Sequence, residues 1–256
     1  MEFDSARYEV GSLQLRLARE RGAPISRPPA DTIDGYLSKP DGPGPFAAIV
    51  LLHGCSGLPD QFKAGKTKGL WSERLAAWGY VVLAPDSFAT RGISNTCSGE
   101  PAPRDADAFG ALAYLARQPF VDPNRIAVVG FSAGGIAALS VAARRDFELF
   151  EDERHFKAAV AFYPRCGPYD AMAIPTLVLA GEADDWLPAS TCKAMVKRQT
   201  GSGASARLVV YPGAYHGFDI PSPSRTYFGH HLEYNASAAE LASEEVRRFL
   251  AEELVR

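Results

Sequence analysis

The chain has 256 residues, of which 46% are hydrophobic and 22% are charged, a balance typical of a folded globular protein. Its formal net charge of −3 argues against nucleic acid as a partner, because phosphate binding needs a basic face. No apolar stretch approaches the roughly 20 residues of a membrane span, and the amino terminus lacks the pattern of a signal peptide. We therefore expect a cytoplasmic protein that has no membrane partner.

Apolar patterns along the chain predict strands that alternate with helices. Alternating or continuous apolar runs predict strands, which in chain order are residues 12–18, 32–40, 46–53, 80–86, 126–131, 156–164, 174–182 and 206–212. Apolar residues at helical spacing predict helices, which in chain order are residues 66–79, 105–118, 133–145, 189–199 and 236–254. Between these elements, residues 87–104 predict an irregular segment and residues 122–125 a turn.

This alternation defines the fold class. Strands that alternate with helices form β-α-β units, so we expect an α/β fold with a mostly parallel, twisted sheet of about eight strands flanked by helices. No repeat or linker divides the chain, which predicts a single domain over residues 1–256. The segment between Tyr163 and Ile174 is too short for a helical lid, so we expect no large cap domain. We expect a monomer or a homodimer.

Four cysteines are scattered along the chain, at positions 55, 97, 166 and 192. They form no Cys-x-x-Cys pair, which argues against a structural zinc site. In a cytosolic protein we expect free thiols. Cys166 and Cys192 both fall near strand ends, and a disulfide between them would suit an oxidised, exported form. We expect neither a metal ion nor an organic cofactor.

The segment GFSAG, residues 130–134, fits the pattern G-x-S-x-G between a predicted strand and a predicted helix. In such a turn the serine adopts a strained backbone conformation, and glycines on either side allow the neighbouring elements to approach closely. A glycine-rich turn with an ordinary serine is the structural alternative. The flanking strand and helix favour Ser132 as a nucleophile.

A serine hydroxyl needs a positioned base, because it is a poor nucleophile at neutral pH. His216 directly follows the predicted strand 206–212, at the edge of the sheet where α/β proteins bind their ligands. His155 precedes a strand and belongs to the opposite edge. His230 and His231 lie in a polar segment and are the alternatives to His216.

The base must in turn be held in the correct tautomer, usually by a carboxylate. Asp184 and Asp185 both follow the predicted strand 174–182. We predict Asp184 for this role, since Asp185 lies near the next helix and could cap it. The order Ser132, Asp184, His216 is the order expected of an α/β-hydrolase.

Acyl transfer also needs two hydrogen-bond donors for the negative oxygen that develops on the carbonyl. One expected donor is the backbone N–H of Ala133, the residue after the nucleophile. The other is the backbone N–H of Cys55, in the glycine-containing loop HGCSGL at residues 53–58. Cys55 would act through its amide rather than its thiol.

Five segments together resemble the dienelactone hydrolase family of α/β-hydrolases: VLLHGCSGL, APDSF followed by RG, VVGFSAGG, GEADDWLP and YPGAYHGF. They span about residues 30 to 250. The resemblance implies an open, capless site and a preference for small or short-chain esters or lactones. Founding members carry cysteine at the position of Ser132 and glutamate at the position of Gly54. The resemblance therefore implies a serine carboxylesterase rather than a hydrolase of dienelactone itself.

The substrate-binding residues are predicted from their closeness in sequence to the three catalytic candidates. The irregular segment 87–104 and the segment 217–231 are the expected pocket walls. The candidate lining aromatic residues are Phe131, Trp186 and Phe218. The candidate partners of a substrate carboxylate are Arg91 and Arg165. Core packing of the rings and surface contacts of the arginines are the structural alternatives.

The resulting hypothesis is an enzyme that cleaves small esters or lactones through an acyl-enzyme on Ser132. One alternative keeps the same three residues but transfers the acyl group to an alcohol or to peroxide, as an acyltransferase or perhydrolase does. The other is a non-catalytic ligand-binding protein, since a fold alone does not establish activity. Covalent labelling of Ser132 by an organophosphorus probe separates the last alternative from the first two.

Overall fold

The structure is a computed structural model that describes residues 1–6, 30–58, 71–143, 154–199, 201 and 203–254. The predicted strand 12–18 and the first part of the predicted helix 66–79 lie outside the described residues. The other predicted strands and helices are each present, with ends that differ by a few residues.

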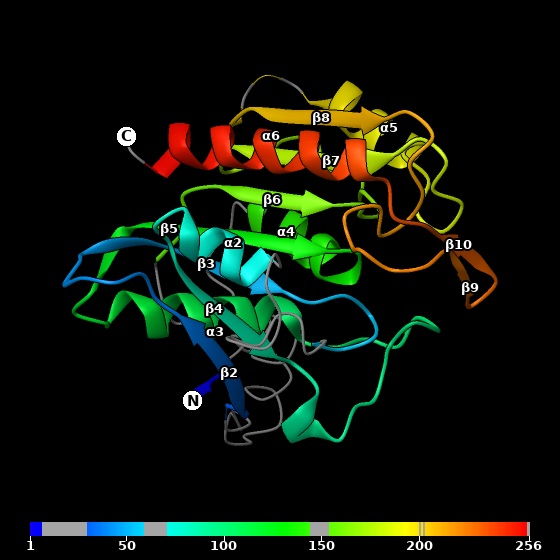
Figure 1. Cartoon of the computed structure of the whole chain (residues 1–256). Helices are drawn as coiled ribbons and strands as arrows, with labels where there is room; N and C mark the ends of the chain where they lie inside the picture. The colour runs from blue at the N-terminus through cyan, green and yellow to red at the C-terminus, as the bar shows by residue number, and fades with distance from the viewer. Residues whose placement is uncertain (7–29, 59–70, 144–153, 200, 202, 255–256) are drawn as a thin grey trace, which may run out of the picture.

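The described residues form a central sheet of eight strands (Figure 1). In chain order these are β1 (Glu2–Asp4), β2 (Thr32–Ser38), β3 (Phe46–Leu52), β4 (Val81–Asp86), β5 (Val121–Phe131), β6 (Ala159–Phe162), β7 (Thr176–Gly181) and β8 (Ala206–Tyr211). Their spatial order is β1-β2-β4-β3-β5-β6-β7-β8. Strand β2 pairs antiparallel with β1 and β4, and all other pairs are parallel. The predicted mostly parallel sheet is thus confirmed.

Helices cover both faces of the sheet (Figure 1). They are α2 (Trp71–Ala77), α3 (Arg104–Ala116), α4 (Ala133–Ala143), α5 (Ser190–Arg198) and α6 (Ala236–Leu254). Buried side chains of α3, α4 and α5 pack in one hydrophobic cluster on one face, and those of α2 and α6 pack in a second cluster on the other. Within the described ranges, no helix combines the length and the apolarity needed to cross a bilayer.

Three local features differ from the sequence-based prediction. Strand β1, at Glu2–Asp4, falls in a segment where the sequence predicts no strand. Strand β5 begins at Val121 and includes residues 122–125, which predict a turn. A short hairpin of β9 (Arg225–Tyr227) and β10 (His230–Leu232) lies within the segment expected to be an irregular wall. The hairpin extends beyond the carboxyl ends of the parallel strands (Figure 1). Its residues are exposed or only partly buried, so the apolar alternation that predicts a strand is absent.

All four cysteines are in disulfides, so the expectation of free thiols is wrong. Cys55 bonds to Cys97 and Cys166 bonds to Cys192, with 4.8 Å between the Cα atoms of each pair. The paired residues are 42 and 26 positions apart in the sequence. Spacing along the chain could not predict the first pair, because the loop after β3 and the loop that contains Cys97 meet only in the folded protein.

Candidate active site

The turn between β5 and α4 carries Ser132 at the carboxyl edge of the sheet. Ser132 has a φ angle of +53°, a left-handed conformation that non-glycine residues seldom adopt. A Cβ atom on Gly130 would overlap the carbonyl oxygen of Gly134, and a Cβ atom on Gly134 would overlap that of Leu52. Glycine is therefore required at both positions for this turn to pack against its neighbours.

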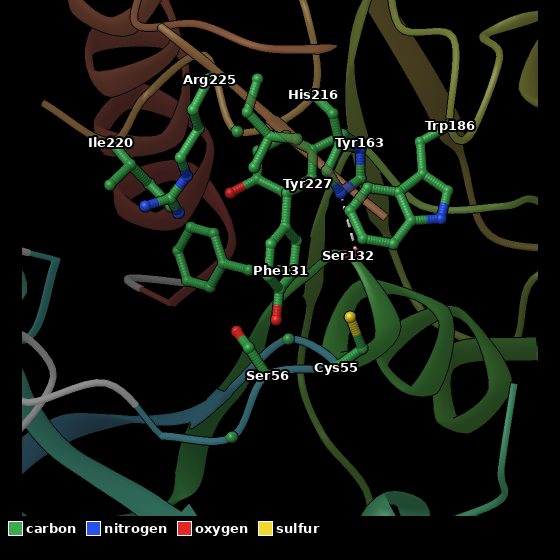
Figure 2. Close-up of a pocket in the computed structure, with 14 residues that line it drawn as sticks. Cys55, Ser56, Phe131, Ser132, Tyr163, Trp186, His216, Ile220, Arg225 and Tyr227 are labelled. Carbon is green, nitrogen blue, oxygen red and sulfur yellow. Dashed lines mark hydrogen bonds between the residues drawn. The ribbon is translucent and has the colours of Figure 1, made fainter. Parts of the chain in front are cut away.

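Three loops bring Ser132, His216 and Asp184 together, and Figure 2 shows the Ser132 and His216 side chains joined by a hydrogen bond. The distance from His216 Nε2 to Ser132 Oγ is 3.0 Å, and that from His216 Nδ1 to Asp184 Oδ2 is 2.8 Å. A carboxylate only accepts hydrogen bonds, so the imidazole Nδ1–H donates to Asp184. Nε2 is then the acceptor for the Ser132 hydroxyl. This is the tautomer that a general base requires.

Backbone amides fix the carboxylate of Asp184. Its Oδ1 atom accepts the N–H groups of Trp186 at 3.0 Å and Leu187 at 2.8 Å. Oδ2 is left for the imidazole. Asp185, the alternative weighed from the sequence, is exposed and accepts the N–H of His231 at 3.2 Å. Of the two aspartates, Asp184 is the one that contacts His216.

The two expected oxyanion donors lie beside the serine. Ala133 is the first residue of α4, and the N–H of a first helical residue has no acceptor within its own helix. A Cβ atom built on Gly54 would lie 3.7 Å from Cβ of Ser132, which shows how closely the loop after β3 approaches the nucleophile turn. No acceptor is paired with the Cys55 N–H among the residues that the structure describes.

His53, the first residue of the same loop, fixes the loop through hydrogen bonds to Gly54 and Ser87. Its Nδ1–H donates to the carbonyl oxygen of Gly54 at 2.8 Å, and its Nε2 accepts the N–H of Ser87 at 3.2 Å. Only a neutral imidazole can make both contacts. Burial, together with the positive charge of Arg104, lowers the pKa of His53 from 6.5 to about 4. His53 is therefore neutral at neutral pH.

The low pKa of His53 predicts a loss of stability in mild acid. The unfolded chain binds a proton at this position near pH 6.5, whereas the folded chain binds it only near pH 4. The free energy of unfolding should be unaffected above pH 6.5 and fall by about 3 kcal/mol as the pH drops to about 4. Urea unfolding across this pH window measures the change.

The variant His53→Asn is the matched control for that experiment, because an asparagine amide offers an N–H where Nδ1 stands but does not titrate. This variant should lack most of the His53 contribution to the pH dependence. Equal pH dependence of the two proteins between pH 6.5 and 4 would show that His53 does not titrate as described.

A pocket of about 380 Å³ opens above Ser132 (Figure 2). Its lining residues are Gly54, Cys55, Ser56, Gly57, Phe131, Ser132, Tyr163, Trp186, His216, Gly217, Ile220, Arg225, Tyr227 and Leu232. Phe131 and Trp186 thus lie where the sequence predicts them. Most of the pocket surface is apolar, which suits the hydrocarbon part of a small ester.

The structure places the other three predicted substrate-binding residues elsewhere. Phe218 is fully buried in the core, where the centre of its ring lies 5.1 Å from that of the Tyr211 ring. The guanidinium of Arg91 donates two hydrogen bonds to Asp107 and one to Asp31. Arg165 is exposed and is not among the residues that line the pocket. The irregular segment 87–104 contributes no lining residue either.

Sequence patterns miss the contribution of the β9–β10 hairpin. The hairpin contributes Arg225, Tyr227 and Leu232 to the pocket wall. Among the described residues that line the pocket, Arg225 is the single lysine or arginine. The Arg225 guanidinium carbon lies 5.8 Å from the centre of the Tyr227 ring. Only the placement of the wall within residues 217–231 could be anticipated, because the hairpin has no buried alternation.

Aromatic rings hold the imidazole of His216. The ring centre of Tyr163 lies 4.7 Å from that of His216, and the ring centre of Trp186 lies at 5.1 Å. Trp186 also stacks on His230, whose ring centre is 4.9 Å away. Burial raises the pKa of Tyr163 well above 10, so its hydroxyl stays protonated. Among the described residues, no group of three His, Cys, Asp or Glu side chains could hold a metal ion.

The sheet order, the helices on both faces and the strand–turn–helix at Ser132 define an α/β-hydrolase. The sequence model of the dienelactone hydrolase family matches residues 33–254. The chain therefore belongs to the dienelactone hydrolase family. This membership makes the chain a carboxylic ester hydrolase.

Individual relatives agree with this assignment. A Methylorubrum extorquens protein named "Putative carboxymethylenebutenolidase" is 28% identical over 211 residues, which cover 73% of this chain and 68% of the relative. An esterase from Thermogutta terrifontis, solved with propionate bound, superposes with a TM-score of 0.64 at 22% identity, over 85% of this chain and 88% of that one. The same esterase phosphoramylated by tabun superposes with the same TM-score, identity and coverage.

Proposed function

We propose that the chain is a serine hydrolase, in which Ser132 attacks the carbonyl carbon of a small ester or lactone. His216 accepts the hydroxyl proton at Nε2 and then returns it to the departing alcohol. Asp184 holds the imidazole in the required tautomer and stabilises its positive charge. The hydrogen bonds of 3.0 Å and 2.8 Å that join these three side chains are the observation that carries the proposal.

Negative charge on the substrate oxygen is stabilised by the backbone N–H groups of Cys55 and Ala133. The resulting acyl-enzyme on Ser132 is hydrolysed when His216 activates a water molecule. The unpaired amide of Cys55 and the helix-initiating amide of Ala133 support this assignment. All five residues belong to what we propose to be a single α/β-hydrolase domain over residues 1–256.

The size and the lining of the pocket support short acyl or alcohol groups as substrates. A volume of about 380 Å³ accommodates a small ester, and the propionate bound to the Thermogutta esterase has a three-carbon chain of the same scale. Arg225 takes the role first predicted for Arg91 and Arg165, as the residue that contacts a carboxylate on the substrate.

The cellular location remains a prediction. Two disulfides are typical of an oxidising compartment, so they weigh against the cytoplasmic location expected from the sequence. An exported form of the enzyme accounts for both bonds.

A panel of p-nitrophenyl esters and small lactones tests the proposed function. The value of kcat/KM should be highest for acetate and propionate esters and fall for acyl chains that exceed the pocket. Paraoxon should modify one residue, Ser132, which peptide mass spectrometry identifies. The hydrolase proposal fails if no ester or lactone is turned over, and the ligand-binding alternative gains support if Ser132 also stays unmodified. Preferential transfer of the acyl group to an added alcohol or to peroxide, rather than to water, would support the acyltransferase alternative.

A further inference from the structure

The peptide group that joins Gly54 to Cys55 has its carbonyl oxygen on one side and its N–H on the other. The described residues contain one cis peptide bond, at Gly44–Pro45, so the Gly54–Cys55 peptide is trans. In a trans peptide the C=O and N–H bonds point in opposite directions. Any group that fixes the Gly54 oxygen therefore also fixes the direction of the Cys55 N–H.

Arg104 is one of the donors that hold this carbonyl oxygen. Its Nη2 atom lies 3.2 Å from the oxygen of Gly54 and 2.9 Å from Oγ1 of Thr96. Thr96 in turn donates its backbone N–H to the carbonyl oxygen of Cys55 at 2.8 Å. The adjacent Cys55–Cys97 disulfide ties the same two loops covalently. Hydrogen bonds thus hold the carbonyl oxygens of both peptide groups that flank the Cα atom of Cys55.

The burial of Arg104 is unusual for a cation. The residue is 6% exposed, and its guanidinium carbon lies 4.9 Å from the centre of the Phe88 ring. No carboxylate forms an ion pair with it among the described residues, and its Nε atom has no hydrogen-bond partner there. The nearby Asp107 is already paired with Arg91 and Ser5.

A buried cation without a carboxylate partner destabilises the folded state unless another interaction compensates for it. Burial lowers the pKa of Arg104 to about 10, so the guanidinium is still charged at neutral pH. Simple support of a loop does not require this charge, because a neutral amide could donate to the same oxygen atoms. A positive charge does, however, stabilise a group that becomes negative during the reaction, such as the substrate oxyanion.

We propose that Arg104 is a positioning residue of the oxyanion site, whose guanidinium orients and polarises the Gly54–Cys55 peptide so that the Cys55 N–H binds the developing oxyanion more strongly. A charge-assisted hydrogen bond to the carbonyl oxygen strengthens the hydrogen bond that the N–H of the same peptide donates. The positive charge also lies behind the peptide on the side away from the substrate. This inference rests on the proposed function and assigns a further residue to it.

The expected effect falls on the transition state, because the substrate carbonyl carries full negative charge only there. Replacing Arg104 by Met should lower kcat for p-nitrophenyl acetate by about 10-fold to 100-fold, less than the ~10²–10³-fold typical of losing an oxyanion donor itself. KM should change by less than about three-fold, as expected for an interaction made mainly in the transition state.

Three variants and a control separate charge from packing. Arg104→Gln can still donate a hydrogen bond but carries no charge, and it should be nearly as slow as Arg104→Met. Arg104→Lys keeps the charge and should retain kcat between those of the wild type and the neutral variants. Arg125→Gln removes a partly exposed arginine that pairs with Asp122 at the amino end of β5, and it should leave kcat unchanged. Thermal unfolding shows whether each variant is folded. If Arg104→Met is unfolded, the comparison of kcat is made with Arg104→Gln.

A pair of inhibitors provides a second readout that loop damage alone would not produce. A trifluoromethyl ketone forms a hemiketal oxyanion on the serine. The corresponding alcohol, in which a methyl carbinol replaces the trifluoromethyl ketone, has no carbonyl to attack and only occupies the pocket. The neutral variants should lose affinity for the trifluoromethyl ketone by the same factor as kcat, with the affinity for the alcohol unchanged.

The inference is overturned if the folded neutral variants keep kcat within about two-fold of the wild type, if Arg104→Lys is as slow as Arg104→Met, or if the affinities for both inhibitors fall together. Each of these results leaves the proposed function intact, provided that wild-type Ser132 reacts with the trifluoromethyl ketone. Failure of the wild type to bind that ketone more tightly than the alcohol would instead contradict the proposed function.

Discussion

Replacing Ser132 by Ala is expected to lower kcat for p-nitrophenyl acetate by at least about 10⁴-fold, because no other hydroxyl replaces the nucleophile next to His216 Nε2. KM should change little, since the removed oxygen is small and the pocket lining stays in place. The low residual rate expected of the variant reflects the oxyanion donors and substrate binding alone. Steady-state kinetics with active-site titration of the wild type measure the effect.

The double variant Ser132→Ala/His216→Ala is the companion to this experiment. Residues that act as a unit give strongly non-additive losses, so the second substitution should slow the reaction by less than about ten-fold beyond the first. If the two residues contributed independently, the fold-losses in kcat of the two single variants would instead multiply. A Ser132→Ala variant that keeps full activity would remove Ser132 from the mechanism.

The α/β fold could be predicted from the sequence because its elements are long and strongly patterned. The apolar runs of β3, β4 and β5 are buried on both faces, and α6 spans the predicted residues 236–254. The positions of Ser132, Asp184 and His216 could also be anticipated. Each of the three follows its own parallel strand, and the carboxyl ends of parallel strands meet at one edge of a sheet.

Contacts between distant segments could not be predicted in the same way. Arg91 and Asp107 pair across 16 positions, and Arg104 reaches Gly54 across 50 positions. Neither contact follows from a periodic pattern. Closeness in sequence was also an unreliable guide, since Phe218 is two residues from His216 but turns into the core. The disulfide Cys55–Cys97 belongs to the same class of contact.

Several of the contacts that could not be predicted from the sequence fix the loop after β3. His53 and Arg104 hydrogen-bond to the carbonyl oxygen of Gly54, and Cys97 forms the disulfide with Cys55. Two of these three side chains are buried ionisable groups, one held neutral and one held charged. The physical demand at this loop is therefore a fixed peptide orientation, which preorganised donors require.

Replacing Asp184 by Asn is expected to lower kcat by about 10⁴-fold while leaving the fold unchanged. The carboxylate Oδ1 atom accepts two backbone N–H groups, those of Trp186 and Leu187. Only the oxygen of an asparagine amide can take this position, so its NH₂ group must face His216. That NH₂ donates to Nδ1 and forces the proton onto Nε2. The imidazole can then no longer accept the proton of Ser132.

Asp185→Asn is the matched control, because Asp185 is the next residue in the same loop but is exposed and contacts the hairpin instead of the imidazole. It should keep kcat within about two-fold of the wild type. Proton NMR gives an independent readout: the His216 Nδ1–H resonance, shifted downfield by its 2.8 Å hydrogen bond to Asp184, should be present in the wild type and in Asp185→Asn and lost in Asp184→Asn. An Asp184→Asn variant that keeps more than about a tenth of wild-type kcat would show that the tautomer of His216 is fixed by something other than this carboxylate.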